Sequence, residues 1–164
     1  MKKELAWIFT AAMMLMFATG CKTPKSIDST YAYNSFETQC LGTDLDGSQT
    51  LRAWGKGRDK AQAIEQARKN AVRDVIFKGI VSGTGECNKK PLLNEVNAAE
   101  KYEAYFDRFF ADGGIYKSFT SLGDEKRLSQ QKSADNSMDN YGVVVRVNRA
   151  ALRQRLIDDG VLKQ

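Results

Sequence analysis

The clearest pattern of apolar and polar positions lies between residues 50 and 81, where a strand-like run is followed by an alanine-rich helical run. Asp59 is the predicted N-cap of this helix, because Gln62 stands three residues later, as a capping box requires. Apolar residues then recur at spacings of three and four, which predicts one helix face made of Ala61, Ile64, Ala67, Ala71 and Val75. Small residues on this face would let the helix lie close against a sheet.

Before this helix, segments 36–43 and 49–55 flank the polar turn Asp44–Ser48, which contains an Asp-Gly pair. Two such segments around Asp-Gly predict a β-hairpin, because the turn needs positive φ angles. A calcium loop is the alternative, since the turn is rich in oxygen ligands. An EF-hand requires glycine at its sixth position and glutamate at its twelfth. Counted from the first aspartate, these positions hold Gln49 and Gly55, so the calcium pattern is incomplete.

The glycines of Gly55-Lys56-Gly57 stand between the predicted strand and the helix. A phosphate-binding loop is one interpretation, but a dinucleotide fingerprint would need glycine or alanine where Lys60 stands. No parallel strand is predicted after the helix, as that motif also requires. We therefore expect these glycines to turn the chain from the strand into the helix.

A second helical pattern begins at Pro91 and is expected to end at Gly113-Gly114. Its apolar face holds Leu93, Val96, Ala99, Tyr102, Phe106, Phe109 and Phe110. An aromatic stripe at helical spacing is more often part of a core than of a binding site, so we assign these side chains to the core.

The last third of the chain predicts a strand, a polar connection, a second strand and a short helix. Residues 115–122 alternate as a strand does, and 123–140 are polar without a strong pattern. Residues 141–147 are the most strand-like run, because β-branched side chains dominate it. Asn148 can cap a helix that follows up to residue 159.

These elements predict an α+β fold. Consecutive strands joined by short polar segments favour an antiparallel sheet of three to four strands. The helices must bury their apolar faces, so two or three of them are expected to pack on one face of the sheet.

The first 20 residues have the pattern of an export signal. A charged start is followed by an apolar run at 5–18 and then by Thr19-Gly20-Cys21. The apolar run is shorter than the about 20 residues that span a bilayer. A small residue pair before cysteine resembles the lipobox of bacterial lipoproteins, in which lipid is attached to the cysteine, although Ala18 replaces the usual leucine. An ordinary secretory signal with a chance cysteine is the alternative.

The resemblance to a lipobox divides the chain into three parts. It implies a lipoprotein signal peptide at 1–20, a tether at 21–35 and a single α+β domain at 36–164, with the membrane bound through lipid on Cys21. By analogy with lipoprotein sorting, Lys22 favours the outer membrane, and the missing acidic run favours the side that faces the periplasm.

A family resemblance rests on a few short motifs. A strand ending in Trp54–Gly57, a helix with alanines at 61, 67 and 71, and a valine-rich strand leading into a short helix resemble small envelope lipoproteins of Gram-negative bacteria. These proteins share a strand-helix-strand-strand-helix domain with the amino-terminal part of flagellar assembly protein T. The resemblance covers about residues 50–159, with the second helix as an insertion. It implies a module for assembly or for binding an envelope protein, and it carries no catalytic residues.

The composition excludes several chemistries. The chain contains no histidine, which removes the Ser-His-Asp triad and the commonest metal ligand. Besides Cys21, only Cys40 and Cys87 remain, too few for a structural zinc site without histidine. In an exported domain such a pair is expected to form a disulfide, with two buried free thiols as the alternative. We expect no metal and no organic cofactor.

The remaining candidates for catalysis are weak. Ser129 and Lys132 match the Ser-x-x-Lys of penicillin-recognising enzymes, but the companion motifs are missing and the pair stands in a predicted loop. Asp158 and Asp159 are adjacent carboxylates at a helix end, where we expect them to face water. The net charge of +5 is interspersed along the chain and does not indicate nucleic-acid binding. A lipid-anchored, non-enzymatic binding or assembly module is therefore the expected function, and a small envelope hydrolase using carboxylates or the Ser-Lys pair is the alternative.

Overall fold

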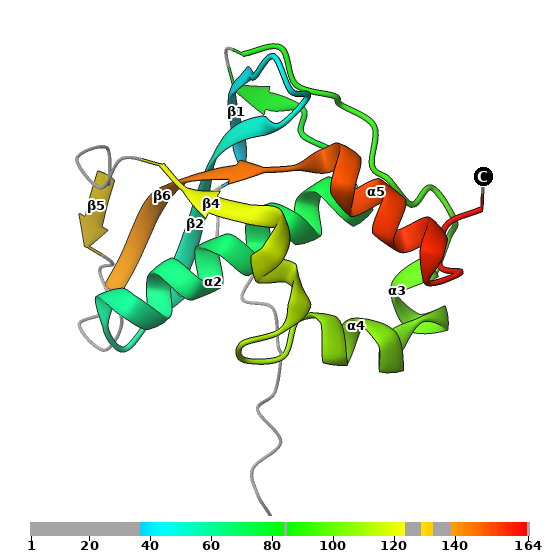
Figure 1. Cartoon of the computed structure of the whole chain (residues 1–164). Helices are drawn as coiled ribbons and strands as arrows, with labels where there is room; N and C mark the ends of the chain where they lie inside the picture. The colour runs from blue at the N-terminus through cyan, green and yellow to red at the C-terminus, as the bar shows by residue number, and fades with distance from the viewer. Residues whose placement is uncertain (1–36, 84, 124–128, 133–138, 164) are drawn as a thin grey trace, which may run out of the picture. The chain divides into compact units, whose positions relative to one another are not determined.

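The computed structural model describes residues 37–83, 85–123, 129–132 and 139–163, without the side chains of 129–132 and 139 (Figure 1). These residues all belong to one compact unit. The predicted signal peptide, the tether and Cys21 lie outside the described residues, so the domain boundaries proposed from the sequence stay predictions.

The sheet has six strands among the described residues, in the order β3-β1-β2-β6-β4, with β5 also paired to β6. Every pair is antiparallel except β1 with β3, which is parallel. The α+β prediction is confirmed, with more strands than the three to four expected. The strands are β1 Gln39–Thr43, β2 Gln49–Gly57, β3 Ser82–Gly83, β4 Thr120–Leu122, β5 Ser129–Lys132 and β6 Asp139–Val147.

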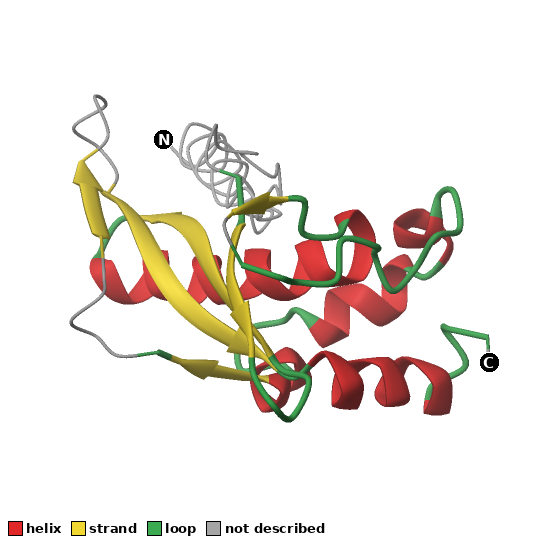
Figure 2. Ribbon diagram, turned by 90° about the horizontal axis from the view of Figure 1, so that it is seen from above, coloured by secondary structure: helices red, strands yellow, loops and turns green. Residues whose placement is uncertain are grey.

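One long helix lies against one face of the sheet, on β2 and β6, and the shorter helices gather near one end of it (Figures 1 and 2). The helices and the inward side chains of the sheet share a single hydrophobic core. The helical elements are α2 Lys60–Arg73, the π-helical turn η2 Asp74–Lys78, α3 Ala98–Lys101, α4 Glu103–Phe109, the 3-10 helix η3 Ile115–Phe119 and α5 Arg149–Asp158.

Both predicted helix caps are confirmed. The Oδ1 atom of Asp59 accepts a hydrogen bond of 2.8 Å from the backbone N–H of Gln62 at the start of α2. The Oδ1 atom of Asn148 accepts one of 2.9 Å from the N–H of Ala151 at the start of α5. Each bond satisfies a backbone donor that a helix start leaves without an intrahelical partner.

The prediction for the glycines at the end of β2 is wrong. Gly55 and Gly57 do not turn the chain, because both lie inside β2 and are buried under α2. A Cβ atom on Gly55 would overlap the backbone of Ala63 and Ala67, and one on Gly57 would overlap the backbone of Ala63. The glycines therefore provide the space in which α2 approaches the strand.

The predicted face of α2 is correct in part. Ala67 and Ala71 are fully buried, but the third buried alanine is Ala63, whereas Ala61 is exposed. Ala63, Ala67 and Ala71 repeat at four-residue intervals and so lie in one row along the helix. Ala61 and Ala63 are equally small and apolar, so hydrophobicity alone does not tell which of them faces the sheet. Gly55 and Gly57 leave space on β2 for the backbone of α2 at Ala63 and Ala67, so the row that contains Ala63 faces the sheet.

The π-helical turn after α2 explains why the second predicted helix starts late. The carbonyls of Val75 and Ile76 accept hydrogen bonds of 3.1 and 2.8 Å from the N–H groups of Leu92 and Leu93. Because these bonds hold the chain against the end of α2, residues 91–97 form no helix.

The apolar face predicted for that second helix is correct at its start, where Leu93 is buried, and in its later part, but not between them. Val96 is 85% exposed and Ala99 is also exposed, contrary to the prediction. Phe106, Phe109 and Phe110 are buried as expected.

The strand predicted at 115–122 is mostly wrong. The segment forms η3 first and only its last three residues form β4. Tyr116 causes the difference, because its fully buried ring and its hydroxyl bond to Glu65 fix this segment against α2. The polar connection at 123–140 also contains strand β5 and the first residues of β6.

Candidate functional site

The structure joins Cys40 and Cys87 through a disulfide bond, the pairing expected from the sequence. Their Cα atoms lie 5.8 Å apart, and 47 positions of sequence separate them. Cys40 is in β1 and is 2% exposed, whereas Cys87 lies in the loop after β3. The bond therefore ties that loop to the sheet next to the short parallel pair of β1 and β3.

The turn between β1 and β2 is a hairpin turn. Its backbone is closed by a hydrogen bond of 2.8 Å from the N–H of Asp44 to the carbonyl of Ser48, and Gly47 has a φ of 78°. The carboxylates of Asp44 and Asp46 form ion pairs of 2.8 and 2.9 Å with Arg146 on β6. The guanidinium group of Arg146 is thus paired with carboxylate oxygens that a calcium ion would need as ligands.

The other chemical candidates from the sequence are not brought together. Ser129 and Lys132 belong to strand β5 rather than to a loop, and their side chains lie outside the description. Asp158 is exposed at the end of α5. Within the described ranges, no group of three acidic or cysteine side chains is placed to hold a metal ion. In the same ranges no helix is both long and apolar enough to cross a membrane.

A pocket lies instead where α4, η3 and α5 meet. It has a volume of about 430 Å³, is open to solvent, and is lined by Tyr105, Arg108, Phe109, Ile115, Arg155 and Asp159. The helical repeat explains which side chains line it. Residues three and four apart share a helix face, so one face of α4 and one face of α5 supply most of the lining.

One wall of the pocket is a hydrogen-bonded trio. The hydroxyl of Tyr105 donates a bond of 2.7 Å to the Oδ2 atom of Asp159, and the Nε atom of Arg155 donates one of 2.6 Å to the same oxygen. The trio joins α4 to α5 across 54 positions of sequence. Asp159 is exposed, as expected from the sequence, but its carboxylate is also bonded to two side chains of the pocket, which the sequence pattern did not indicate.

The trio also sets the protonation states of its members. Burial raises the pKa of Tyr105 well above its usual range, and the bond to the Asp159 carboxylate adds to the rise. Burial acts to raise the pKa of Asp159, but the hydrogen bonds from Arg155 and Tyr105 outweigh it and lower the pKa overall. At neutral pH the phenol is therefore neutral and the carboxylate ionised. A general acid or base works best with a pKa near the working pH, so this pair is poorly suited to proton transfer.

The lining also contains a second cation, Arg108 of α4. The Nε atom of Arg108 donates a hydrogen bond of 3.0 Å to the carbonyl of Ala104, one turn earlier in α4. Its two terminal nitrogens have no hydrogen bond or ion pair with any other residue that the structure describes. Because Arg155 is paired with Asp159, the pocket has one uncompensated positive charge.

The apolar part of the pocket is rigid. Phe109 is 2% exposed, and its ring stacks on Phe119 with the ring centres 6.1 Å apart and on Tyr105 with the centres 5.8 Å apart. Stacked aromatic rings contribute to stability beyond the area that they bury. Two of the lining residues, Tyr105 and Phe109, thus belong to a packed aromatic cluster.

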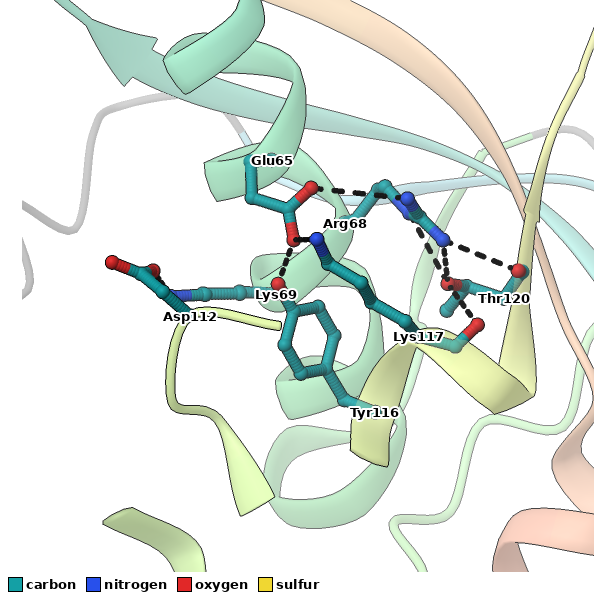
Figure 3. Close-up of polar contacts among 7 residues, drawn as sticks. All are labelled: Glu65, Arg68, Lys69, Asp112, Tyr116, Lys117 and Thr120. Carbon is teal, nitrogen blue, oxygen red and sulfur yellow. Dashed lines mark hydrogen bonds and ion pairs between the residues drawn. The ribbon is translucent and has the colours of Figure 1, made fainter. Parts of the chain in front are cut away.

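A polar network fixes η3, which carries Ile115 into the pocket (Figure 3). Glu65 of α2 accepts a hydrogen bond from the Tyr116 hydroxyl and forms an ion pair of 3.1 Å with Lys117. At the end of η3, Arg68 donates a hydrogen bond of 2.8 Å to the hydroxyl of Thr120. Figure 3 shows these side chains converging between α2 and η3. Glu65 and Arg68, three residues apart on α2, therefore hold the 3-10 helix in place.

Sequence reasoning missed this pocket. The spacing of Tyr105, Arg108 and Phe109 places them on one face of a helix, and the same holds for Arg155 and Asp159. These spacings were a usable signal within each helix. No local pattern states that the two faces meet, because the contact depends on where η3 and β6 place the helices.

Comparison with known proteins identified no matching family model, curated protein or solved structure.

Proposed function

We propose that the chain is a lipid-anchored, non-enzymatic protein of the cell envelope whose domain binds a partner there. The observation that carries the proposal is the Cys40–Cys87 disulfide in a chain that starts with a signal-like segment ending at Cys21. Disulfides persist in oxidising compartments such as the periplasm and are rare in the cytosol. The disulfide and the signal-like segment thus both favour a location in the cell envelope.

The charge and apolar pattern of residues 1–21 supports anchoring through Cys21. A single acyl chain gives only marginal membrane binding, whereas two or more chains on one cysteine hold a domain stably. The outer membrane, with the domain facing the periplasm, is the location we propose.

The chemistry of the described side chains supports binding rather than catalysis. The titratable pair in the pocket has pKa values displaced in opposite directions, the phenol upward and the carboxylate downward. Neither group would exchange protons readily near neutral pH. Asp44 and Asp46 are paired with Arg146, which leaves them unsuited to activate water. We therefore propose that the domain acts by recognition, with an envelope protein as its partner.

Chemical crosslinking in the native envelope followed by mass spectrometry tests this function. We expect the affinity-purified protein to carry a reproducible adduct with a specific envelope protein. The matched control is the Cys21→Ser variant, whose domain is unchanged but whose anchor is removed, and whose adduct should be lost or weakened. Adducts that are equally abundant with unrelated abundant proteins, or none at all, would contradict a binding module.

A further inference from the structure

We infer that the pocket between α4, η3 and α5 binds a small organic monoanion, in which one carboxylate is attached to an apolar group. The inference goes beyond the proposed function, because it concerns a ligand of the domain rather than its protein partner. It rests on the charge, the apolar surface and the volume of this one pocket.

The charge of the pocket selects an anion. The lining contains two guanidinium groups and one carboxylate. Asp159 is bonded to Arg155 at 2.6 Å, so these two charges largely cancel. The terminal nitrogens of Arg108 make no bond to any other described residue, and they form a planar fork suited to a carboxylate. One excess positive charge matches one negative charge on the ligand.

The rest of the lining selects an apolar body. Ile115 and the ring of Tyr105, both only partly buried, supply most of the apolar lining, whereas Phe109 is nearly fully buried and adds little surface. The Tyr105 hydroxyl is already bonded to Asp159. Ligand sites commonly combine such apolar surface with a few polar groups that fix orientation, in volumes of about 300–1,000 Å³. A volume of about 430 Å³ accommodates a small molecule of this kind.

The site is also held in a defined geometry. Arg108 is anchored to its own helix through Ala104, and the Tyr105–Asp159 bond fixes α4 relative to α5. The network around Glu65 holds η3 on the remaining side. A site whose groups are already in position loses less free energy in ordering when a ligand binds.

Equilibrium dialysis of the full-length protein with 4-phenylbutyrate tests the inference. The matched probe 4-phenylbutyramide has the same apolar body without the charge, and acetate has the charge without the body. We expect the acid to bind and to bind at least about tenfold more tightly than either control, since a hydrogen bond to a charged group contributes about that factor. Equal retention of the acid and the amide would overturn the inference.

Two variants locate the binding. Arg108→Gln removes the unpaired cation and should weaken 4-phenylbutyrate about tenfold, while leaving the far-ultraviolet circular dichroism spectrum unchanged. Arg153→Gln makes the same charge change on α5 outside the pocket and should leave the affinity unchanged. If both variants lose affinity equally, the probe responds to overall charge and the pocket is not the site. A failed dialysis experiment with a positive crosslinking result would reject this ligand and keep the proposed binding module.

Discussion

Gly55 of β2 lies so close beneath Ala63 of α2 that a Cβ atom on the glycine would overlap the Ala63 carbonyl oxygen. It would also overlap the backbone nitrogen of Ala67, one turn further along the helix. Close packing of backbone against backbone leaves no flexible side chain that can move aside. The contact of a strand glycine with a row of helix alanines therefore sets the distance between the sheet and α2.

The first prediction concerns this contact. Gly55→Ala should lower the free energy of unfolding by about 3 kcal/mol, near the upper end of the usual range for overpacking, because backbone must shift to admit the methyl group. The control is Gly42→Ala in the neighbouring strand, where an added Cβ meets nothing within 4 Å. Urea unfolding measures both variants. A stability loss for Gly55→Ala no larger than that for Gly42→Ala would contradict the close contact.

The second prediction uses two alanines of the same helix. Ala67→Leu should destabilise the domain by about 1–3 kcal/mol, since Ala67 is fully buried against the strand. Ala61→Leu should change stability by less than about 0.5 kcal/mol, because Ala61 is exposed. Thermal unfolding of the two variants compares them directly. Similar losses of stability for both variants would mean that Ala61 is buried, as expected from the sequence, and would contradict the structure.

Local signals predicted the local features of this fold. Asp59 and Asn148 cap helices as expected, because a cap depends on residues within one turn. The central strands and the hairpin turn at Gly47 were also recognisable for this reason. The failures involve long-range contacts. Tyr116 is drawn out of a strand by Glu65, 51 positions earlier.

The pocket illustrates the same limit. Tyr105 and Asp159 belong to helices that their own periodicity predicts, but their contact spans 54 positions of sequence. Which faces meet depends on the length of η3 and on the π-helical turn after α2. Neither irregular element has a sequence signal as strong as an amphipathic repeat. The pairing of Cys40 with Cys87 was accessible for a simpler reason, since only two cysteines follow Cys21.

The third prediction concerns the disulfide. Protein prepared from the native envelope and unfolded without reductant should show no reactive thiol from Cys40 or Cys87 in a thiol titration. The loop between them spans 47 positions, so replacing both by serine should lower the free energy of unfolding by about 4 kcal/mol on the loop-entropy model. Two reactive thiols per chain before reduction would contradict the bond.

The fourth prediction concerns the pH dependence of the Tyr105–Asp159 contact. Because the pKa of Tyr105 in the folded protein is raised by burial and by Asp159, this contact stabilises the fold below the ordinary tyrosine value of 10.0. The stabilisation is lost as the pH rises through the higher folded value. The difference in absorbance near 295 nm between the wild type and Tyr105→Phe follows this phenol alone. We expect its transition above the ordinary tyrosine range.

Asp159→Asn provides the control for this titration. Without the carboxylate, the pKa of Tyr105 should fall toward its ordinary value, although burial still raises it. If the phenol titrates at the same pH with aspartate and with asparagine at position 159, the contact does not contribute to the shift.

Membrane fractionation of the Cys21→Ser variant beside the wild type tests the central proposal most directly. Serine cannot carry the proposed lipid, so the variant should leave the membrane fraction and appear in the soluble fraction, while the wild type stays with the membranes after a high-salt wash. The wash removes proteins held only by charge, which matters for a chain with a net charge of +5. A Cys21→Ser variant that remains with the membranes after the wash would contradict anchoring through Cys21.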